Sequence, residues 1–361
     1  MKGHLVVEDG TIYTGKIFGA RAVRYGELIF NTSMTGYQEI LFDPSYKGQI
    51  LAMTYPLIGN YGVNTEDCES ERIHLEGFVV REKSRIYSNW RAQKSLEELF
   101  KEQKVVGLEG VDTRKITETI REFGALKAGI FPGNRDKREM VTLVQKSPSL
   151  VGRDIVSRVI KSEAYTWQNF GKYKVVVLDC GVKYNILRLL ARLNLKVVVY
   201  PATAPWQEIE KEEPDGILIS NGPGDPEPLK TVVSTVSNLV GRHPVFGICL
   251  GHQILGQVFG GKTYKLKFGH HGANHPVKDL TTGRIYITVQ NHGFCVDQRT
   301  LDETEIEITH TNLNDGTLEG MAHKKWPIFS VQFHPEDAPG PRDTEYLFTK
   351  FYTLIENAQE S

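Results

Sequence analysis

The chain is poor in cysteine. Only four occur among its 361 residues, at Cys68, Cys180, Cys249 and Cys295. No two of them form a C-x-x-C pair, so neither a zinc knuckle nor a thioredoxin-like redox motif is indicated. Few, scattered cysteines are typical of a reducing compartment, and we therefore expect a cytoplasmic protein.

Long apolar runs are also missing. No segment approaches the ~18 consecutive apolar residues of a transmembrane helix. Charge at Lys2 and Glu8 comes too early for a secretory signal peptide. We accordingly expect a soluble protein that does not associate with a membrane.

An excess of charge of either sign is absent as well. The 43 basic and 44 acidic residues leave a net charge of −1. This argues against an extensive nucleic-acid surface, because phosphate binding requires clustered Lys and Arg. The basic stretch Lys262–Lys267 is interpreted as a solvated strand face. No G-x-x-x-x-G-K-[ST] phosphate loop occurs, so ATP chemistry of that kind is not expected in this chain.

What is present is apolar material for about two domains. Residues 1–153 are predicted to form a strand-rich α/β domain, with helices at Ser95–Gln103 and Thr113–Phe123. Its expected strands include Leu5–Val7, Glu27–Phe30 and Ile50–Met53. Residues 154–172 are polar and lack periodicity, which predicts a linker.

Residues 173–361 alternate apolar strands with helices. The expected strands are Val175–Leu178, Lys196–Tyr200, Gly216–Ile219 and Pro244–Ile248, and the expected helices are Asn185–Leu193 and Leu229–Val240. This alternation predicts a doubly wound, mostly parallel sheet. Ligands bind such sheets beyond the carboxyl ends of the strands, and the residues that can carry chemistry occur there.

The segment Gly247–Gln253 has the sequence Gly-Ile-Cys-Leu-Gly-His-Gln and precedes an expected helix at Gln253–Phe259. It has the form of a nucleophile elbow with cysteine in place of serine. Flanking glycines allow a tight turn, and the amino end of the following helix favours a thiolate. We interpret Cys249 as a nucleophile; a buried structural cysteine is the alternative.

A cysteine nucleophile usually requires a base. His334 and Glu336 follow the apolar segment Ile328–Phe333 as His-Pro-Glu, so the carboxylate could orient the imidazole and stabilise its charged form. An ordinary loop histidine is the alternative. The loop Asn221–Pro226 follows another strand, and its amides could complete an oxyanion hole with the Leu250 amide. A simple tight turn is the alternative there.

Together these motifs resemble those of the class I, triad-type glutamine amidotransferases. Segments outside the catalytic motifs are similar to a narrower family, the small subunits of carbamoyl phosphate synthetase. These segments are Phe30–Leu41, Asp43–Tyr46, Thr54–Asn60, Lys267–Pro276 and Gln290–Phe294. The resemblance extends from Leu5 to about Phe351, so it covers nearly the whole chain.

The resemblance implies a glutaminase in which Cys249 forms a glutamyl thioester, His334 transfers protons and Glu336 orients His334. The residues that match glutamine-binding or oxyanion positions of the family are Ser45, Gly222, Gly224, Leu250, Gln253, Asn291, Gly293 and Phe294. Because Ser45 belongs to the first domain, we expect the glutamine pocket at the domain interface.

The resemblance implies no metal or cofactor in this chain. It implies a heterodimer with a large subunit, which uses ATP and Mg, receives ammonia through a tunnel and supplies arginine or pyrimidine synthesis. The histidines His270, His271 and His275 could suggest a metal site. No acidic or cysteine ligand shares their spacing, so we interpret them as a structural or subunit-contact loop.

Two other interpretations remain open on the motifs. The elbow and the His-Pro-Glu motif would also permit an amidotransferase of another synthase or a free-standing cysteine hydrolase, but the first ~150 residues argue against both. A catalytically silent regulatory subunit would have lost the thiol or the base, and both are present.

Overall fold

The computed structural model describes residues 1–360 of the chain. These residues divide into two compact units. Unit 1 consists of Met1–Arg153 and Lys267–Gly272, and unit 2 consists of Asp154–Leu266 and the residues from Ala273 onward. Within the described residues, no helix has the length and apolar character needed to cross a membrane.

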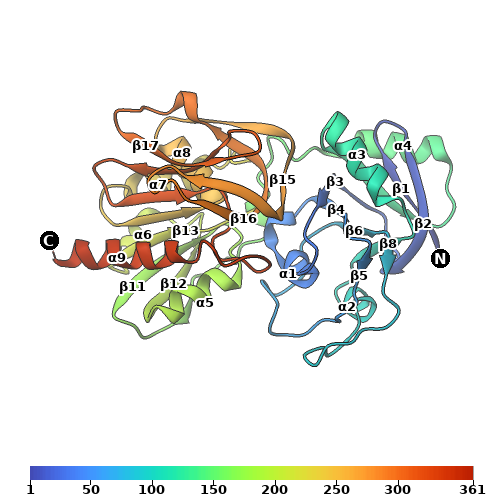
Figure 1. The fold of residues 1–361 in the computed structure, drawn as a ribbon, viewed down its shortest axis with the longest axis horizontal. Helices are drawn as coiled ribbons and strands as arrows, with labels where there is room; N and C mark the ends of the chain where they lie inside the picture. The colour runs from blue at the N-terminus through green and yellow to red at the C-terminus, as the bar shows by residue number, and fades with distance from the viewer. Residues whose placement is uncertain (361) are drawn as a thin grey trace. The chain divides into compact units, whose positions relative to one another are not determined.

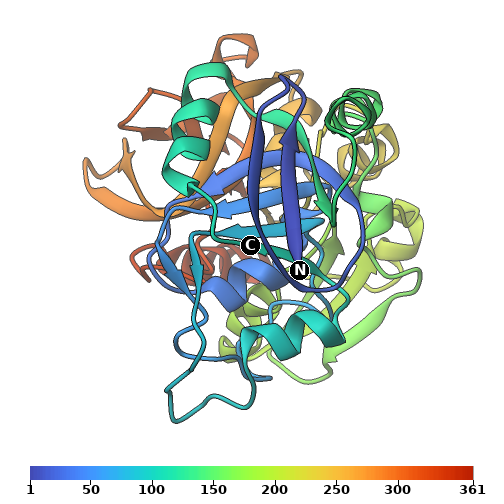
Figure 2. The ribbon, with the colours of Figure 1, turned by 90° about the vertical axis from the view of Figure 1, so that its right-hand side faces the viewer.

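Unit 1 is built on a closed barrel in the order β1–β2–β8–β6–β4–β3–β9 (Figure 2, blue to green). Its strands are β1 (Lys2–Val7), β2 (Ile12–Gly19), β3 (Arg24–Asn31), β4 (Gln49–Met53), β6 (Gly77–Val80), β8 (Val106–Glu109) and β9 (Leu126–Pro132). β1 pairs antiparallel with β2 and β9, whereas β3, β4, β6 and β8 run parallel. A separate short pair joins β5 (Leu57–Ile58) and β7 (Glu82–Lys83).

The barrel strands are apolar on both sides because both sides are covered. In β4, Ile50 and Ala52 belong to one buried cluster and Leu51 and Met53 to another. Successive side chains of a strand point to opposite faces, so each cluster collects one face. The first cluster includes residues of α3, and the second includes residues of α1 and α2.

Unit 1 contains four α-helices, and three of them begin after a residue whose side chain caps the helix. They are α1 (Tyr37–Phe42), α2 (Leu96–Glu102), α3 (Thr113–Phe123) and α4 (Lys137–Lys146), with a short 3₁₀ helix η1 (Pro44–Tyr46). Ser95 and Glu98 form a capping box at the start of α2. The Asp112 carboxylate accepts a hydrogen bond from the Lys115 amide at the start of α3. The predictions of both α2 and α3 are confirmed.

Unit 2 contains most of a ten-stranded sheet in the order β10–β12–β11–β13–β14–β19–β18–β17–β15–β16. Its strands are β10 (Tyr165–Gln168), β11 (Tyr173–Asp179), β12 (Leu195–Pro201), β13 (Gly216–Ile219), β14 (Val245–Ile248), β15 (Lys262–Asp279), β16 (Ile285–Asp297), β17 (Ile306–Asn312), β18 (Leu318–His323) and β19 (Ile328–Val331). The central strands β12, β11, β13, β14 and β19 are parallel. The predicted doubly wound core is present, and antiparallel strands extend it on both sides.

Helices cover both faces of the parallel strands (Figure 1). They are α5 (Tyr184–Arg192), α6 (Trp206–Glu210), α7 (Lys230–Leu239), α8 (Leu250–Val258) and α9 (Tyr346–Glu360), with 3₁₀ turns η2 (Val156–Arg158) and η3 (Gln298–Thr300). Residues of α5 and α9 share one buried cluster, and residues of α6, α7 and α8 share the other.

Two local features differ from the sequence-based expectation. Residues 154–172, predicted as a linker, contain η2 and β10, and β10 pairs antiparallel with β12. The histidines at 270, 271 and 275, predicted to lie in a loop, lie in the long strand β15, and His270 and His271 are buried. Their polar side chains conceal the strand pattern, because β-propensity is set by packing against neighbours as much as by residue type.

Candidate active site

Cys249 lies at the turn between β14 and α8, as the N-cap residue of that helix. Its backbone φ is 53° and its ψ −101°, and non-glycine residues rarely adopt a positive φ. The glycines on either side are required by space. A Cβ on Gly247 would lie 2.7 Å from Leu255 Cδ1, and a Cβ on Gly251 would collide with the Ile219 carbonyl oxygen. The turn therefore has the strand–elbow–helix geometry that the sequence indicates.

The Cys249 side chain is buried, with 1% of its surface exposed. Its sulfur lies 3.8 Å from the Asn291 carbonyl oxygen and 3.7 Å from Gln332 Nε2. The carbonyl can accept from a thiol, and the amide can donate to a thiolate. Both protonation states of Cys249 thus have a partner within unit 2.

The sheet sets the spacing between Cys249 and His334. β14 and β19 are adjacent parallel strands, and Ile248 lies opposite Val331. The Cys249 amide donates to the Val331 carbonyl oxygen at 2.9 Å, and the His334 amide donates to the Val289 carbonyl oxygen at 2.9 Å. The residues that follow the two strands are therefore fixed by backbone hydrogen bonds on both sides.

His334 and Glu336 form a buried pair. His334 Nδ1 lies 2.7 Å from Glu336 Oε1, and the two side chains are 1% and 0% exposed. Burial alone would lower the pKa of His334, but the nearby Glu336 and Cys249 outweigh it and raise that pKa to about 10. Nε2, the other ring nitrogen, has no hydrogen-bond partner within residues 1–360. The imidazole is thus oriented by its carboxylate and favours the protonated form beside the sulfur.

Lys183 is a member of this cluster that the sequence interpretation missed. Its Nζ lies 2.9 Å from Glu336 Oε1, and the two side chains are 2% and 0% exposed. Nζ also donates to the Asp337 carbonyl oxygen at 2.5 Å. Burial would raise the pKa of Glu336, but Lys183 and then His334 lower it to about 2. Lys183 immediately precedes α5, after the same strand edge that carries the other polar residues, and that position was the signal available in the sequence.

The Gly-rich loop that follows β13 lies directly beside the elbow. A Cβ on Gly222 would lie 2.7 Å from Leu250 Cδ2 and would collide with the Cys180 carbonyl oxygen. The Asn221 side-chain oxygen accepts a hydrogen bond from the Lys183 amide at 3.1 Å. Unit 2 therefore brings together the two segments whose amides were predicted to form an oxyanion hole.

The other predicted glutamine-binding residues are distributed over both units. Gln253 is buried in α8, and its Nε2 donates to the Phe294 carbonyl oxygen at 2.8 Å and to Gln332 Oε1 at 3.1 Å. Asn291, Gly293 and Phe294 lie in β16, and Gly224 lies in the loop after β13 with φ +86°. Ser45 lies in η1 of unit 1, where its amide donates to Asp43 Oδ1 at 2.8 Å. The role of Ser45 at a pocket between domains stays a prediction.

Gln332 is a second residue that the sequence interpretation did not single out. It is fully buried and lies just beyond β19, within reach of both Cys249 and Gln253. Gln332 lies in the apolar segment before His334, so the sequence pattern indicated only an ordinary strand residue. The position of its amide beside the sulfur could not be read from spacing alone.

Residues 176–354 match the family model described as glutamine amidotransferase class-I, and residues 5–130 match the one described as carbamoyl-phosphate synthase small chain, CPSase domain. The first family match defines unit 2, which carries the elbow, the buried His–Glu pair and the doubly wound core, as a glutamine amidotransferase domain.

Full-length relatives narrow the assignment. A carbamoyl phosphate synthase small chain of Syntrophotalea carbinolica is 49% identical over 100% of both chains. One of Archaeoglobus fulgidus is 50% identical over 98% of this chain and 99% of its own length. A carbamoyl phosphate synthase pyrimidine-specific small chain of Halalkalibacterium halodurans is 48% identical over 99% of this chain and 98% of its own. The chain belongs to the family of carbamoyl phosphate synthase small chains.

Proposed function

We propose that this chain hydrolyses glutamine through a glutamyl thioester on Cys249 and passes the ammonia to a carbamoyl phosphate synthase large chain. The observation that carries this proposal is the strained elbow cysteine beside the buried His334–Glu336 pair. A thiol, a base and a carboxylate that orients the base are the groups that nucleophilic acyl transfer requires.

In the first step, the Cys249 sulfur attacks the side-chain carboxamide carbon of glutamine. His334 holds the proton of the thiol, which its high pKa favours, and then transfers that proton to the leaving nitrogen as the carbon–nitrogen bond breaks. Ammonia departs and a γ-glutamyl thioester remains. Water then attacks the thioester with His334 as the base, so that glutamate is released and the thiol is restored.

Electrostatics around the base support this sequence. Glu336 accepts from Nδ1 of His334 and so directs Nε2 toward the reacting atoms. Lys183 keeps Glu336 ionised and thereby preserves the charge that stabilises the imidazolium. The amides of Leu250 and Gly222 would hold the oxyanion of the tetrahedral intermediate.

The glutamine itself would be held by the residues around this centre. We propose that Gly224, Gln253, Asn291, Gly293 and Phe294 surround the substrate in unit 2. A Cβ built on Gly293 meets no atom within 4 Å, so this part of β16 leaves space beside the chain. Ser45 of unit 1 would complete the pocket.

The remaining steps belong to the partner. Ammonia would enter the large chain, where ATP, Mg and bicarbonate yield carbamoyl phosphate for arginine or pyrimidine synthesis. Cysteine chemistry of this kind requires no metal or cofactor in the small chain. All four cysteines are free thiols, which supports a reducing, cytoplasmic location.

The test is release of ammonia from glutamine by the purified chain, with and without its large chain, for the native protein and Cys249→Ala. We expect slow hydrolysis by the chain alone, acceleration by the large chain, and no activity in the variant. Because free hydrolysis would waste glutamine, turnover should depend on the partner. Undiminished activity of Cys249→Ala would refute the nucleophile, and a rate unchanged by the large chain would refute the coupling.

A further inference from the structure

Gln332 is a fully buried side chain within the candidate active site. It follows β19 directly, and its backbone amide donates to the Glu319 carbonyl oxygen at 2.9 Å. A primary amide carries two N–H donors and one acceptor oxygen, and burying such a group without hydrogen bonds is unfavourable. The partners of this side chain therefore indicate what it does.

The neighbours of Gln332 determine which way its amide points. The Phe294 carbonyl oxygen can only accept, so the Gln253 group that lies 2.8 Å from it must be the nitrogen Nε2. Gln253 Nε2 also lies 3.1 Å from the Gln332 amide, and a donor there requires the oxygen Oε1 of Gln332. Nε2 of Gln332 consequently faces the Cys249 sulfur, at 3.7 Å.

This orientation gives the Cys249 sulfur an N–H donor inside the protein. The Asn291 carbonyl oxygen, at 3.8 Å, can accept from the thiol, whereas Nε2 of Gln332 can donate to the thiolate. A hydrogen bond to the charged form of a group favours that form. Because Cys249 is 1% exposed, water contributes little to stabilising the thiolate, and a donor from the protein matters more.

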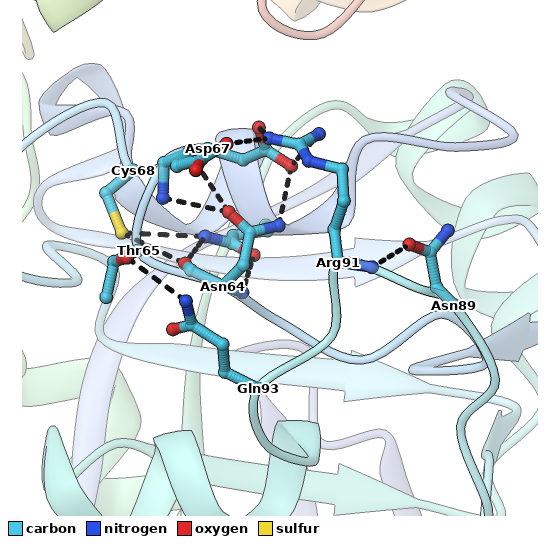
Figure 3. A network of polar contacts seen from close by, with 9 residues as sticks. Asn64, Thr65, Asp67, Cys68, Asn89, Arg91 and Gln93 are labelled. Carbon is cyan, nitrogen blue, oxygen red and sulfur yellow. Dashed lines mark hydrogen bonds and ion pairs between the residues drawn. The ribbon is translucent and has the colours of Figure 1, made fainter.

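A second cysteine of the chain has a similar pair of contacts. In unit 1, the Cys68 sulfur lies 3.6 Å from the Asn64 carbonyl oxygen, within the polar network of Figure 3, and 3.5 Å from Gln38 Nε2. An amide beside a sulfur is therefore not by itself a catalytic feature. Gln332 differs because its sulfur belongs to the elbow and also acts on His334, whose pKa it helps to raise. Cys68 accordingly serves as a reference thiol within the same protein.

We propose that Gln332 is a positioning residue for the hydrolysis of glutamine. Its Nε2 donates to the Cys249 thiolate and holds the sulfur for attack, and Gln253 fixes the direction of that donor. Gln253, which was predicted to bind glutamine, thereby has a second role inside the protein. The inference rests on the proposed function, because Cys249 is the nucleophile of that reaction.

The first measurement is the rate at which iodoacetamide alkylates Cys249 in the full chain, followed by mass spectrometry of its peptide. Gln332→Met removes the amide at similar length, and we expect alkylation about 10-fold slower. Gln332→Glu keeps an oxygen for Gln253, but its carboxylate offers the sulfur no N–H and repels the thiolate, so the loss should be larger. The alkylation rate of Cys68 should stay native in both variants.

The matched control is Gln168→Met in β10 of unit 2. Gln168 is half-buried, and its Nε2 donates to the carbonyl oxygens of Ala191 and Leu195 at 3.3 Å and 2.9 Å. This variant loses a glutamine amide without touching the sulfur, so Cys249 should react at the native rate. Cys180 and Cys295 are 0% exposed, so they should stay unreactive in every variant that keeps unit 2 folded.

The second measurement is release of ammonia from glutamine by the chain together with its large chain. In Gln332→Met we expect kcat to fall about 10-fold. KM should change little, because Gln253 keeps its bond to the Phe294 carbonyl oxygen. If Gln332 served only to hold Gln253, the result would be a raised KM in Gln332→Met and nearly native activity in Gln332→Glu. That pattern would overturn the inference.

Native alkylation and native kcat in Gln332→Met would overturn it as well. If neither Gln332 variant folds, Gln253→Met decides, because it keeps the Gln332 amide but removes the group that directs it. Slower alkylation of Cys249 in Gln253→Met is then expected, and a native rate would overturn the inference. Failure of the proposed function has a different signature, since Cys249→Ala would then release ammonia as fast as the native chain.

Discussion

Replacement of Lys183 by methionine removes one half of the buried ion pair in the active site. Nζ lies 2.9 Å from Glu336 Oε1, with the two side chains 2% and 0% exposed. Methionine retains an unbranched apolar chain but carries no charge. The Glu336 carboxylate would then stay buried with His334 as its remaining cationic partner, and loss of one partner of a buried pair is among the changes that destabilise a protein strongly.

Burial would raise the pKa of Glu336, but Lys183 and then His334 lower it to about 2, so Lys183 makes a large contribution to keeping the buried carboxylate ionised. Loss of one partner of a buried pair typically costs about 3–5 kcal/mol. We therefore expect Lys183→Met to lower the free energy of unfolding of unit 2 by about 3 kcal/mol at pH 7. Because the folded pKa is depressed, this difference should disappear as the pH falls through about 2.

The matched control is Lys172→Met. Lys172 Nζ lies 2.8 Å from Glu356, nearly the same distance, but the two side chains are 51% and 35% exposed. An exposed pair contributes about 0–1 kcal/mol, so the control should lose less than about 1 kcal/mol. The assay is urea unfolding at pH 7, followed by circular dichroism and by tryptophan fluorescence so that the units can be separated.

Equal losses in Lys183→Met and Lys172→Met would refute the reasoning from burial. A third variant checks the cause. Lys183→Met combined with Glu336→Gln has no buried charge at this position, so it should be more stable than Lys183→Met alone. If the double variant were less stable, the contribution of Lys183 would have to come from packing or from its bond to the Asp337 carbonyl.

Three further predictions concern the same unit. Glu336→Gln should lower the pKa of His334 from about 10, because an amide does not stabilise the imidazolium; an NMR titration of the ring measures this, and an unchanged value would contradict it. Gly251→Ala should lower the free energy of unfolding, measured with urea, by about 1–3 kcal/mol, because the added methyl group collides with a carbonyl oxygen. The control is Gly293→Ala, whose added methyl group meets no atom within 4 Å. Equal losses of unfolding free energy in the two variants would argue against the steric explanation. Burial and then Glu345 raise the pKa of Asp337 to about 8 in the folded protein, whereas its pKa in the unfolded chain is about 3.9. The stabilisation of the native state by protonated Asp337 is therefore complete below about pH 3.9. It is lost as the pH rises through about 8. The melting temperature should accordingly fall less between about pH 6 and about pH 9 in Asp337→Asn than in the native protein. Identical falls in the variant and the native protein would exclude a contribution of Asp337 to the pH dependence of stability.

Much of the fold could be predicted because local signals and packing agree. The continuous apolar run Val175–Leu178 predicts a covered parallel strand, and it forms the middle of β11. Ser95 and either Asp112 or Thr113 predict helix starts, and Ser95 and Asp112 act as the N-caps of α2 and α3. The barrel of unit 1 could not be predicted, because closure depends on pairing between strands far apart in the sequence, such as β1 with β9.

The site was predictable where chemistry leaves a pattern in the sequence. The spacing around Cys249 and the His-Pro-Glu motif indicate a nucleophile and a base, and unit 2 brings them together. Lys183 and Gln332 were missed because their importance comes from burial next to other groups. A lysine before a helix is ordinarily a surface residue, and only the tertiary structure shows that this one is paired inside the protein.

The hydrogen bond from the Cys249 amide to Val331, within the pairing of β14 and β19, has a consequence for control of the enzyme. The residues proposed as nucleophile and base follow neighbouring strands, so backbone hydrogen bonds of the sheet hold the two chain segments together. A regulator that moved β14 and β19 apart would have to break the hydrogen bonds between them. We therefore expect regulation to act on whether glutamine reaches the Cys249 side chain, which is 1% exposed.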